Sequence, residues 1–192
     1  NDNELAVAQY LAQWLNQYDI DTHIDYISGQ RANLIATIGS GKPVVAVSGH
    51  MDVVNEGNHD DWTSPPFELT ERNGHLYGRG AADMKSGLAA LVIAMIEIKA
   101  SGQLKNGTIK LLATAGEEME QAGSEQLYRK GYMDDVDALV IAEPSYPSIV
   151  YAHKGSMDIK ITSKGRSSHS STPFMGENAI TPLIELIQNI NQ

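Results

Sequence analysis

The stretch TIKLLATAGEE, residues 108–118, joins a run of apolar residues to a pair of glutamates that follows it directly. Two similar stretches, PVVAVSGHMD (43–52) and DALVIAEP (137–144), also place acidic or histidine residues just after an apolar run. Near-continuous apolar runs are typical of strands that helices cover on both faces. We therefore expect buried strands of one sheet at residues 43–48, 109–114 and 138–142.

Helical patterns alternate with these runs, because apolar residues recur there at a spacing of three to four. The helical stretches are residues 3–18, 85–102 and 122–131. Further β-rich runs are residues 33–39, 75–80 and 148–155. The alternation predicts an α/β fold in which a sheet lies between two layers of helices.

The pattern changes after about residue 153. Residues 156–170 alternate in the manner of a half-exposed strand, and residues 176–192 form an amphipathic helical pattern. One strand and one helix cannot bury a core of their own. We therefore expect one domain over residues 1–152 and the incomplete start of a second over residues 153–192.

Composition excludes several classes of partner and site. The formal charge of −10 and the lack of a Lys or Arg cluster argue against nucleic acid or an anionic membrane as partner. Because the chain has no cysteine, a metal ion would need nitrogen and oxygen ligands. The longest apolar stretch, residues 87–98, is too short to span a bilayer, and no signal peptide opens the sequence. We expect a soluble, cytoplasmic protein.

The candidate functional residues follow the carboxyl ends of predicted strands, where loops usually carry function. Each has an ordinary explanation when taken singly: an aspartate can cap a helix or close a turn, and a glutamate pair can be a solvated loop. Together at one edge of a sheet they favour a metal site. These residues are His50, Asp52, Asp83, Glu117, Glu118 and Glu143.

Four ordered motifs resemble those of the di-zinc metallohydrolases that include acetylornithine deacetylase, succinyl-diaminopimelate desuccinylase, aminoacylase and glutamate carboxypeptidase. The motifs are SGHMDVV (48–54), LYGRGAADMKSGLAA (76–90), TAGEEMEQAGSE (114–125) and VIAEPS (140–145). The resemblance also includes GRSSHSSTPFMGENAI (165–180). It implies a three-layer αβα zinc-exopeptidase-like catalytic domain, followed by the truncated start of an α+β ferredoxin-like lid and dimerisation domain.

The resemblance also implies a set of metal ligands. His50 and Glu143 would bind a first metal ion, Glu118 a second, and Asp83 both ions as a bridge. Two metal ions about 3.5–4 Å apart need a shared ligand, and a bridging carboxylate supplies it. The ions would be zinc or cobalt, two per complete subunit, and the peptide bond Asp83–Met84 would be cis.

Three further residues receive catalytic or supporting roles by the same resemblance. Glu117 would be the general base, because a carboxylate that is not committed to a metal can shuttle a proton. Asp52 would accept the other ring N–H of His50 and fix its tautomer. His169 resembles a lid histidine that reaches the partner subunit's site and stabilises an oxyanion. An ordinary polar loop is the alternative for His169.

The sequence starts without methionine, inside a helical pattern, and the resemblance implies one more histidine ligand beyond Gln192. We therefore expect an incomplete second metal site and an inactive fragment of a longer enzyme.

The predicted activity of that enzyme is hydrolysis of the amide bond of an N-acyl amino acid, with N-succinyl-diaminopimelate as the first choice of substrate. Acetylornithine deacetylase and a carboxypeptidase or dipeptidase are the alternatives within the family. Its partners would be a small N-acyl amino acid or short peptide and a second copy in a homodimer. Two other classes are a relative without catalytic activity and a magnesium phosphohydrolase. The intact candidate set argues against the first class, and the lack of a Gly-rich phosphate loop argues against the second.

Overall fold

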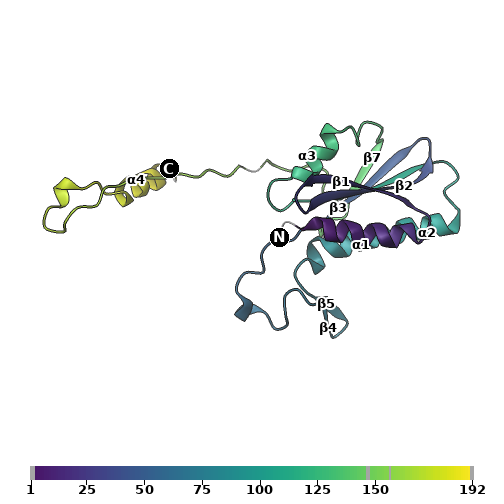
Figure 1. Cartoon of the computed structure of the whole chain (residues 1–192), viewed down its shortest axis with the longest axis horizontal. Helices are drawn as coiled ribbons and strands as arrows, with labels where there is room; N and C mark the ends of the chain where they lie inside the picture. Colours follow the sequence, from purple (N-terminus) through teal and green to yellow (C-terminus); the bar gives the residue numbers. More distant parts are fainter. Residues whose placement is uncertain (1–2, 146–147, 156, 191–192) are drawn as a thin grey trace. The chain divides into compact units, whose positions relative to one another are not determined.

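The computed structural model describes residues 3–145, 148–155 and 157–190 (Figure 1). The chain divides into two compact units, Asn1–Ile149 and Val150–Gln192, and each is described by itself. The helices are α1 (Glu4–Asn16), α2 (Ser86–Ser101), α3 (Ala122–Arg129) and, in the second unit, α4 (Ile180–Ile190).

A five-stranded sheet forms the centre of the first unit, in the order β1-β2-β6-β3-β7. Its strands are β1 (Asp21–Ser28), β2 (Arg31–Ser40), β3 (Val44–His50), β6 (Gly107–Thr114) and β7 (Ala138–Ile141). Strands β1 and β2 are antiparallel, as are β2 and β6, whereas β3 is parallel to both β6 and β7. The carboxyl ends of β3, β6 and β7 therefore lie at one edge of the sheet.

Helices cover the sheet on both faces, with α1 and α2 on one side and α3 on the other (Figure 1). Alternate residues of the strands point to opposite faces. Leu34 and Leu111 accordingly join the core beneath α1 and α2, while Ile35 and Leu112 pack with Leu127 of α3. The predicted α/β fold with helices on both sides of the sheet is confirmed.

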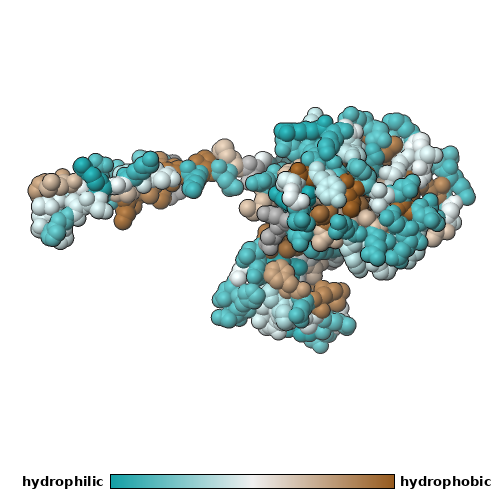
Figure 2. Space-filling view, in the orientation of Figure 1, coloured by the Kyte–Doolittle hydropathy of each residue, from teal (hydrophilic) through white to brown (hydrophobic). Residues whose placement is uncertain are grey.

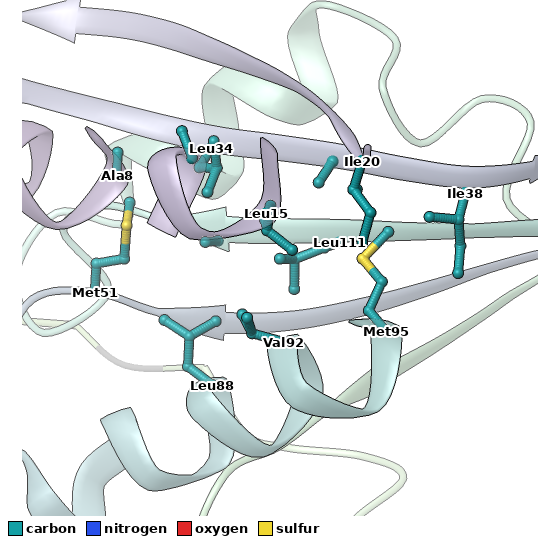
Figure 3. Packing of buried hydrophobic residues seen from close by; sticks show 13 residues of the cluster. Ala8, Leu15, Ile20, Leu34, Ile38, Met51, Leu88, Val92, Met95 and Leu111 are labelled. Carbon is teal, nitrogen blue, oxygen red and sulfur yellow. The ribbon is translucent and has the colours of Figure 1, made fainter. Parts of the chain in front are cut away.

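The larger core lies between the sheet and the helices α1 and α2 (Figure 3). Leu15, Leu34 and Leu111 are completely buried there, and Met95 is 1% exposed. Burial of one such side chain contributes about 1.5–3 kcal/mol. This packing fixes the strands firmly and so gives the residues at their ends a rigid support.

Strand β7 differs from the prediction of three strands covered on both faces. Its sequence is apolar, yet all four of its residues are exposed, including Val140 and Ile141 at 54% each. The strand lies at the edge of the sheet, beyond β3. An apolar run shows that the side chains of a strand are suited to burial, whereas the position of the strand in the sheet decides whether they are buried.

Two other parts of the prediction were wrong or incomplete. Strand β1 was not predicted, because DTHIDYIS contains polar residues on both of its faces. The strands expected at residues 148–155 and 156–170 are absent from the residues that the structure describes there, where only an isolated bridge joins Arg166 to Glu177. Residue 156 lies outside the described residues. A strand needs a hydrogen-bonded partner, which the local alternation of residues does not supply.

A long excursion between β3 and α2 carries a short 3-10 helix, η1 (His59–Asp61), and the hairpin of β4 (Thr70–Arg72) and β5 (His75–Tyr77). Figure 2 shows apolar surface on this segment, to which Leu69 and Leu76 contribute. The excursion ends in an irregular π-helical turn, η2 (Ala81–Lys85), which leads directly into α2. None of the helices in the described part of the chain is long and apolar enough to cross a membrane.

Candidate metal centre

His50, the last residue of β3, is the buried centre of the site. Its side chain is 1% exposed, and its backbone N–H donates to Sδ of Met84 at 3.1 Å. On the ring, Nδ1 lies 3.0 Å from the carbonyl oxygen of Asp52 and 3.5 Å from its carboxylate. The carbonyl is thus the nearer acceptor, and donation from Nδ1 directs Nε2 to the opposite side.

Asp83 lies on the side to which Nε2 of His50 points. It belongs to η2 but has extended backbone angles (φ −118°, ψ 105°), and its peptide bond to Met84 is cis, which confirms that prediction. Its Oδ1 lies 3.2 Å from Nε2. The side chain of Met84 is completely buried under β3, so this turn is anchored next to the histidine.

Glu143 reaches the same point from beyond the end of β7, with Oε1 at 3.8 Å from Nε2 of His50. Three donor atoms, one each from His50, Asp83 and Glu143, therefore lie within 4.8 Å of one another. This approach depends on Gly87 at the start of α2, because a Cβ there would lie 2.1 Å from the carbonyl oxygen of Ala142.

Asp52 connects the histidine to the loop of the two glutamates. Its side chain is 6% exposed, and its two carboxylate oxygens accept the backbone N–H groups of Glu117 at 3.1 Å and Glu118 at 3.0 Å. Burial alone would raise the pKa of Asp52, but the hydrogen bond from His50 and these two N–H groups lower it to about 2. Asp52 is therefore a fixed anion that holds two parts of the site.

Glu117 and Glu118 extend from this loop in different surroundings. Oε2 of Glu117 lies 3.8 Å from Nε2 of His50, and the side chain is 47% exposed. Burial raises the pKa of Glu118, and the negative charge of Asp83 raises it further. Burial and the charge of Asp83 also raise the pKa of Glu143, although the charge of His50 opposes them.

The electrostatics of these residues fit a cation. Burial would lower the pKa of His50, but the hydrogen bond and charge of Asp52, with Asp83 and Glu143, raise it to about 9. A protonated histidine thus balances a crowded set of carboxylates when no metal ion does so. One imidazole nitrogen and two carboxylate oxygens are the donor types that zinc and cobalt bind, and the ring is already oriented by a neighbour. The donor set fits such an ion.

Comparison with known proteins identifies the family of this site. The model of the family described as "Peptidase family M20/M25/M40" matches residues 46–190. The chain belongs to this family. The match includes all six candidate residues at the sheet edge.

Individual members of the M20/M25/M40 family agree with this assignment. The chain is 56% identical over 192 residues to a Staphylococcus epidermidis protein named "Probable succinyl-diaminopimelate desuccinylase", and it covers 47% of that protein. It therefore spans about half the length of the curated relatives it matches.

Two solved structures resemble the chain. Human carnosine dipeptidase 1 is 30% identical with a TM-score of 0.61, over 72% of this chain and 32% of that one. A tripeptidase from Staphylococcus aureus has a TM-score of 0.62 over 98% of this chain and 51% of its own, at 20% identity. The second likeness concerns the fold alone.

The structure brings together six of the seven predicted site residues of this family member. The seventh, His169, belongs to the unit Val150–Gln192, where its Nδ1 accepts the backbone N–H of Ser171 at 3.2 Å. Its catalytic role stays a prediction, as do the individual roles of the other six.

Two supporting residues were missed in the sequence. Met84 supplies the sulfur that accepts the His50 N–H, and Asn33 is a completely buried amide in β2 beside the glutamate loop. The signal for Asn33 was available, since it is a polar residue in the apolar run NLIATIG, and buried polar groups require partners.

Proposed function

We propose that the whole protein containing this chain is a metal-dependent amidohydrolase that cleaves N-acyl amino acids, with N-succinyl-diaminopimelate as its substrate. The observation that carries the proposal is the group His50, Asp83 and Glu143, with the uncommitted carboxylate of Glu117 beside it. The choice of substrate is supported by the name of the Staphylococcus epidermidis relative.

In this proposal His50, Asp83 and Glu143 hold a first zinc or cobalt ion, and Asp83 and Glu118 contribute to a second. A bound ion of this kind supplies a Lewis acid and lowers the pKa of a water molecule to about 7. Glu118 suits a ligand role because burial and the negative charge of Asp83 both raise the pKa of its carboxyl group. A cation between the two carboxylates would relieve this repulsion.

Glu117 accepts the proton of the attacking water and returns it to the leaving amine. Its side chain is 47% exposed and therefore accessible to a substrate, and it lies outside the three-residue donor group. Asp52 supports this step from two directions, since it orients the ring of His50 and holds the backbone of Glu117. General bases of this kind contribute about 10²- to 10⁴-fold to the rate.

A dipeptidase is the second candidate. It is favoured by the 30% identity to human carnosine dipeptidase 1, whose cleaved bond is an amide as well. The same residues would perform the same steps, so the two candidates differ only in the groups that bind the substrate.

We also propose His169 as an oxyanion donor, a homodimer formed through residues 153–192, and a cytoplasmic location, as the sequence predicts.

A substrate panel tests the proposal. The whole protein, loaded with zinc or cobalt, is assayed with N-succinyl-diaminopimelate, N-acetylornithine and a set of dipeptides. We expect the highest kcat/KM with the succinylated substrate. Highest activity on dipeptides would favour the second candidate. Metal analysis of the protein as purified, before any metal is added, should find zinc or cobalt, and magnesium in their place would contradict both candidates.

A further inference from the structure

Asn33 is a completely buried side chain whose hydrogen-bonding groups are both used. Its Oδ1 accepts the backbone N–H of Ala115 at 3.0 Å, and its Nδ2 donates to the carbonyl oxygen of Gly123 at 3.1 Å. The last register pair of β2 and β6 is Leu34 with Ala113. Beyond this pair, the hydrogen bond between the Ala115 N–H and the Asn33 side chain links β2 to the residues that follow β6.

The two partners of Asn33 are the ends of one loop, residues 115–123. Gly123 also donates its backbone N–H to the carbonyl oxygen of Ala115 at 2.9 Å, so three hydrogen bonds close the loop at its base. Glu117 and Glu118 lie on this loop. The Asn33 side chain forms its hydrogen bonds to the loop backbone and none to either carboxylate, so any effect that it has on them passes through that backbone.

The base of loop 115–123 has no spare room. A Cβ on Gly123 would lie 2.4 Å from the carbonyl oxygen of Ala115 and 2.5 Å from Oδ1 of Asn33. Real Cβ atoms do not approach these atoms so closely, so an added methyl group would force the base of the loop apart. Gly123 and Asn33 therefore form one packed unit.

Only an amide serves both ends of the loop. The Ala115 N–H requires an acceptor and the Gly123 carbonyl requires a donor, and an asparagine side chain offers one of each in a single orientation. A carboxylate of the same shape would keep the acceptor but would place a negative charge against the Gly123 carbonyl. An unpaired buried polar group costs about 1–3 kcal/mol.

We propose that Asn33 is a positioning residue for catalysis: by closing loop 115–123 from β2, it sets where Glu117 stands relative to His50. This inference rests on the proposed function, in which Glu117 is the general base. Asp52 holds the same loop from the other side, through the N–H groups of Glu117 and Glu118. The loop is thus held at its base by a neutral amide and near its tip by a carboxylate.

The test uses Asn33→Asp and Gly123→Ala in the whole protein, because these variants disturb the base of the loop from two sides. For both we expect kcat to fall by about 10²-fold with little change in KM, the effect of a displacement of about 1 Å at the reacting groups. The affinity of the 192-residue chain for its first zinc ion should stay unchanged, since His50, Asp83 and Glu143 lie outside the loop.

Lys110→Ala is the matched control for lost stability. Lys110 lies in β6, and its Nζ donates to the carbonyl oxygen of Tyr132 at 2.9 Å and to the carboxylate of Asp135 at 2.5 Å, contacts that involve neither Asn33 nor loop 115–123. Its loss should lower the free energy of unfolding without changing kcat. Equal losses of kcat in Lys110→Ala and Asn33→Asp at equal loss of stability would overturn the proposal.

A double-mutant cycle separates this inference from the proposed function. If Asn33 acts through Glu117, Asn33→Asp should cost less than about twofold in kcat when Glu117→Gln is already present. If kcat of the double variant falls by the product of the two single-variant losses, the positioning role of Asn33 is overturned, while the assignment of Glu117 as the base stays intact. A Glu117→Gln variant with wild-type kcat would instead overturn the proposed role of Glu117, and this inference with it.

Discussion

The candidate metal centre has a buried half and an exposed half. His50 and Asp52 expose 1% and 6% of their side chains, whereas Asp83, Glu117 and Glu143 expose between 38% and 58%. The buried pair is held by hydrogen bonds to the backbone, and the three carboxylates converge on it from separate loops. The buried half thus fixes the geometry, while the exposed half is open to a cation and a substrate.

This division predicts different consequences for changes in the two halves. Replacing a carboxylate of the exposed half should alter catalysis or the direct binding of the metal ion and leave the fold intact. A change in the buried half should alter the affinity for metal, because it moves or reorients the ligands.

The largest effect is expected for Glu117→Gln in the exposed half. Loss of a general base should lower kcat by about 10²- to 10⁴-fold, with zinc affinity and the free energy of unfolding unchanged. Steady-state kinetics and a zinc titration measure these quantities. Glu120→Gln is the matched control, because Glu120 lies on the same loop, its side chain is 77% exposed, and within the described part of the chain its ion-pair partner is Arg31 alone. Loss of zinc binding in Glu117→Gln would place this residue among the ligands and contradict the division.

The second prediction concerns the pH dependence of the metal-free chain. The folded-state pKa of His50 is raised to about 9, above the ordinary value of 6.5. A raised pKa contributes stability that is complete below about pH 6.5 and is lost as the pH rises through about 9, amounting to about 3 kcal/mol. Urea unfolding with a chelator present should show this loss. His50→Gln should remove it, and an identical pH dependence in that variant would contradict the assignment.

A smaller effect is expected for Asp52→Asn in the buried half. The negative charge that lies beside His50 and holds the loop of Glu117 would be lost, and zinc affinity should fall by about 10- to 100-fold. Competition with a chelator of known affinity measures this change. Asp61→Asn removes one negative charge from an exposed position in η1 and should leave the affinity unchanged. An equal fall in zinc affinity in both variants would mean that Asp52 acts only through its contribution to the net charge of the chain.

The smallest effect is expected for Gly87→Ala, which acts on the spacing of the exposed ligands. The added Cβ would lie 2.1 Å from the Ala142 carbonyl, so the start of α2 must move away from the residues after β7. Asp83 and Glu143 should separate, weakening zinc binding and lowering the free energy of unfolding by about 1–3 kcal/mol. Ala89→Ser, at an exposed position on the same helix, should change neither quantity. A zinc affinity for Gly87→Ala equal to that of the unaltered chain would contradict the proposed spacing role.

The sequence predicted much of this site because its residues lie just after strands or turns whose pattern is local. Apolar runs located β3 and β6, and the parallel arrangement then brought His50 and Glu117 to one edge of the sheet. The resemblance to a known family supplied the roles that position alone leaves open. Asp83, which alone would be read as a helix cap, is the clearest example.

What the sequence did not predict depends on contacts between distant segments. The predicted burial of β7 was wrong, because the burial of its apolar residues depends on neighbouring elements that the sequence pattern does not specify. Asn33 was missed because its partners, Ala115 and Gly123, lie more than 80 residues further along the chain. The expected strand at 148–155 failed for a similar reason, since strand pairing depends on a partner.

The most direct test of the account is an anomalous-scattering map at the zinc edge, from crystals of the 192-residue chain grown with zinc. The account predicts a peak bound by Nε2 of His50 and by carboxylate oxygens of Asp83 and Glu143, with Glu117 beside it as a free carboxylate. A peak bound by other residues, or no peak at this edge of the sheet, would contradict the assignment of the metal centre.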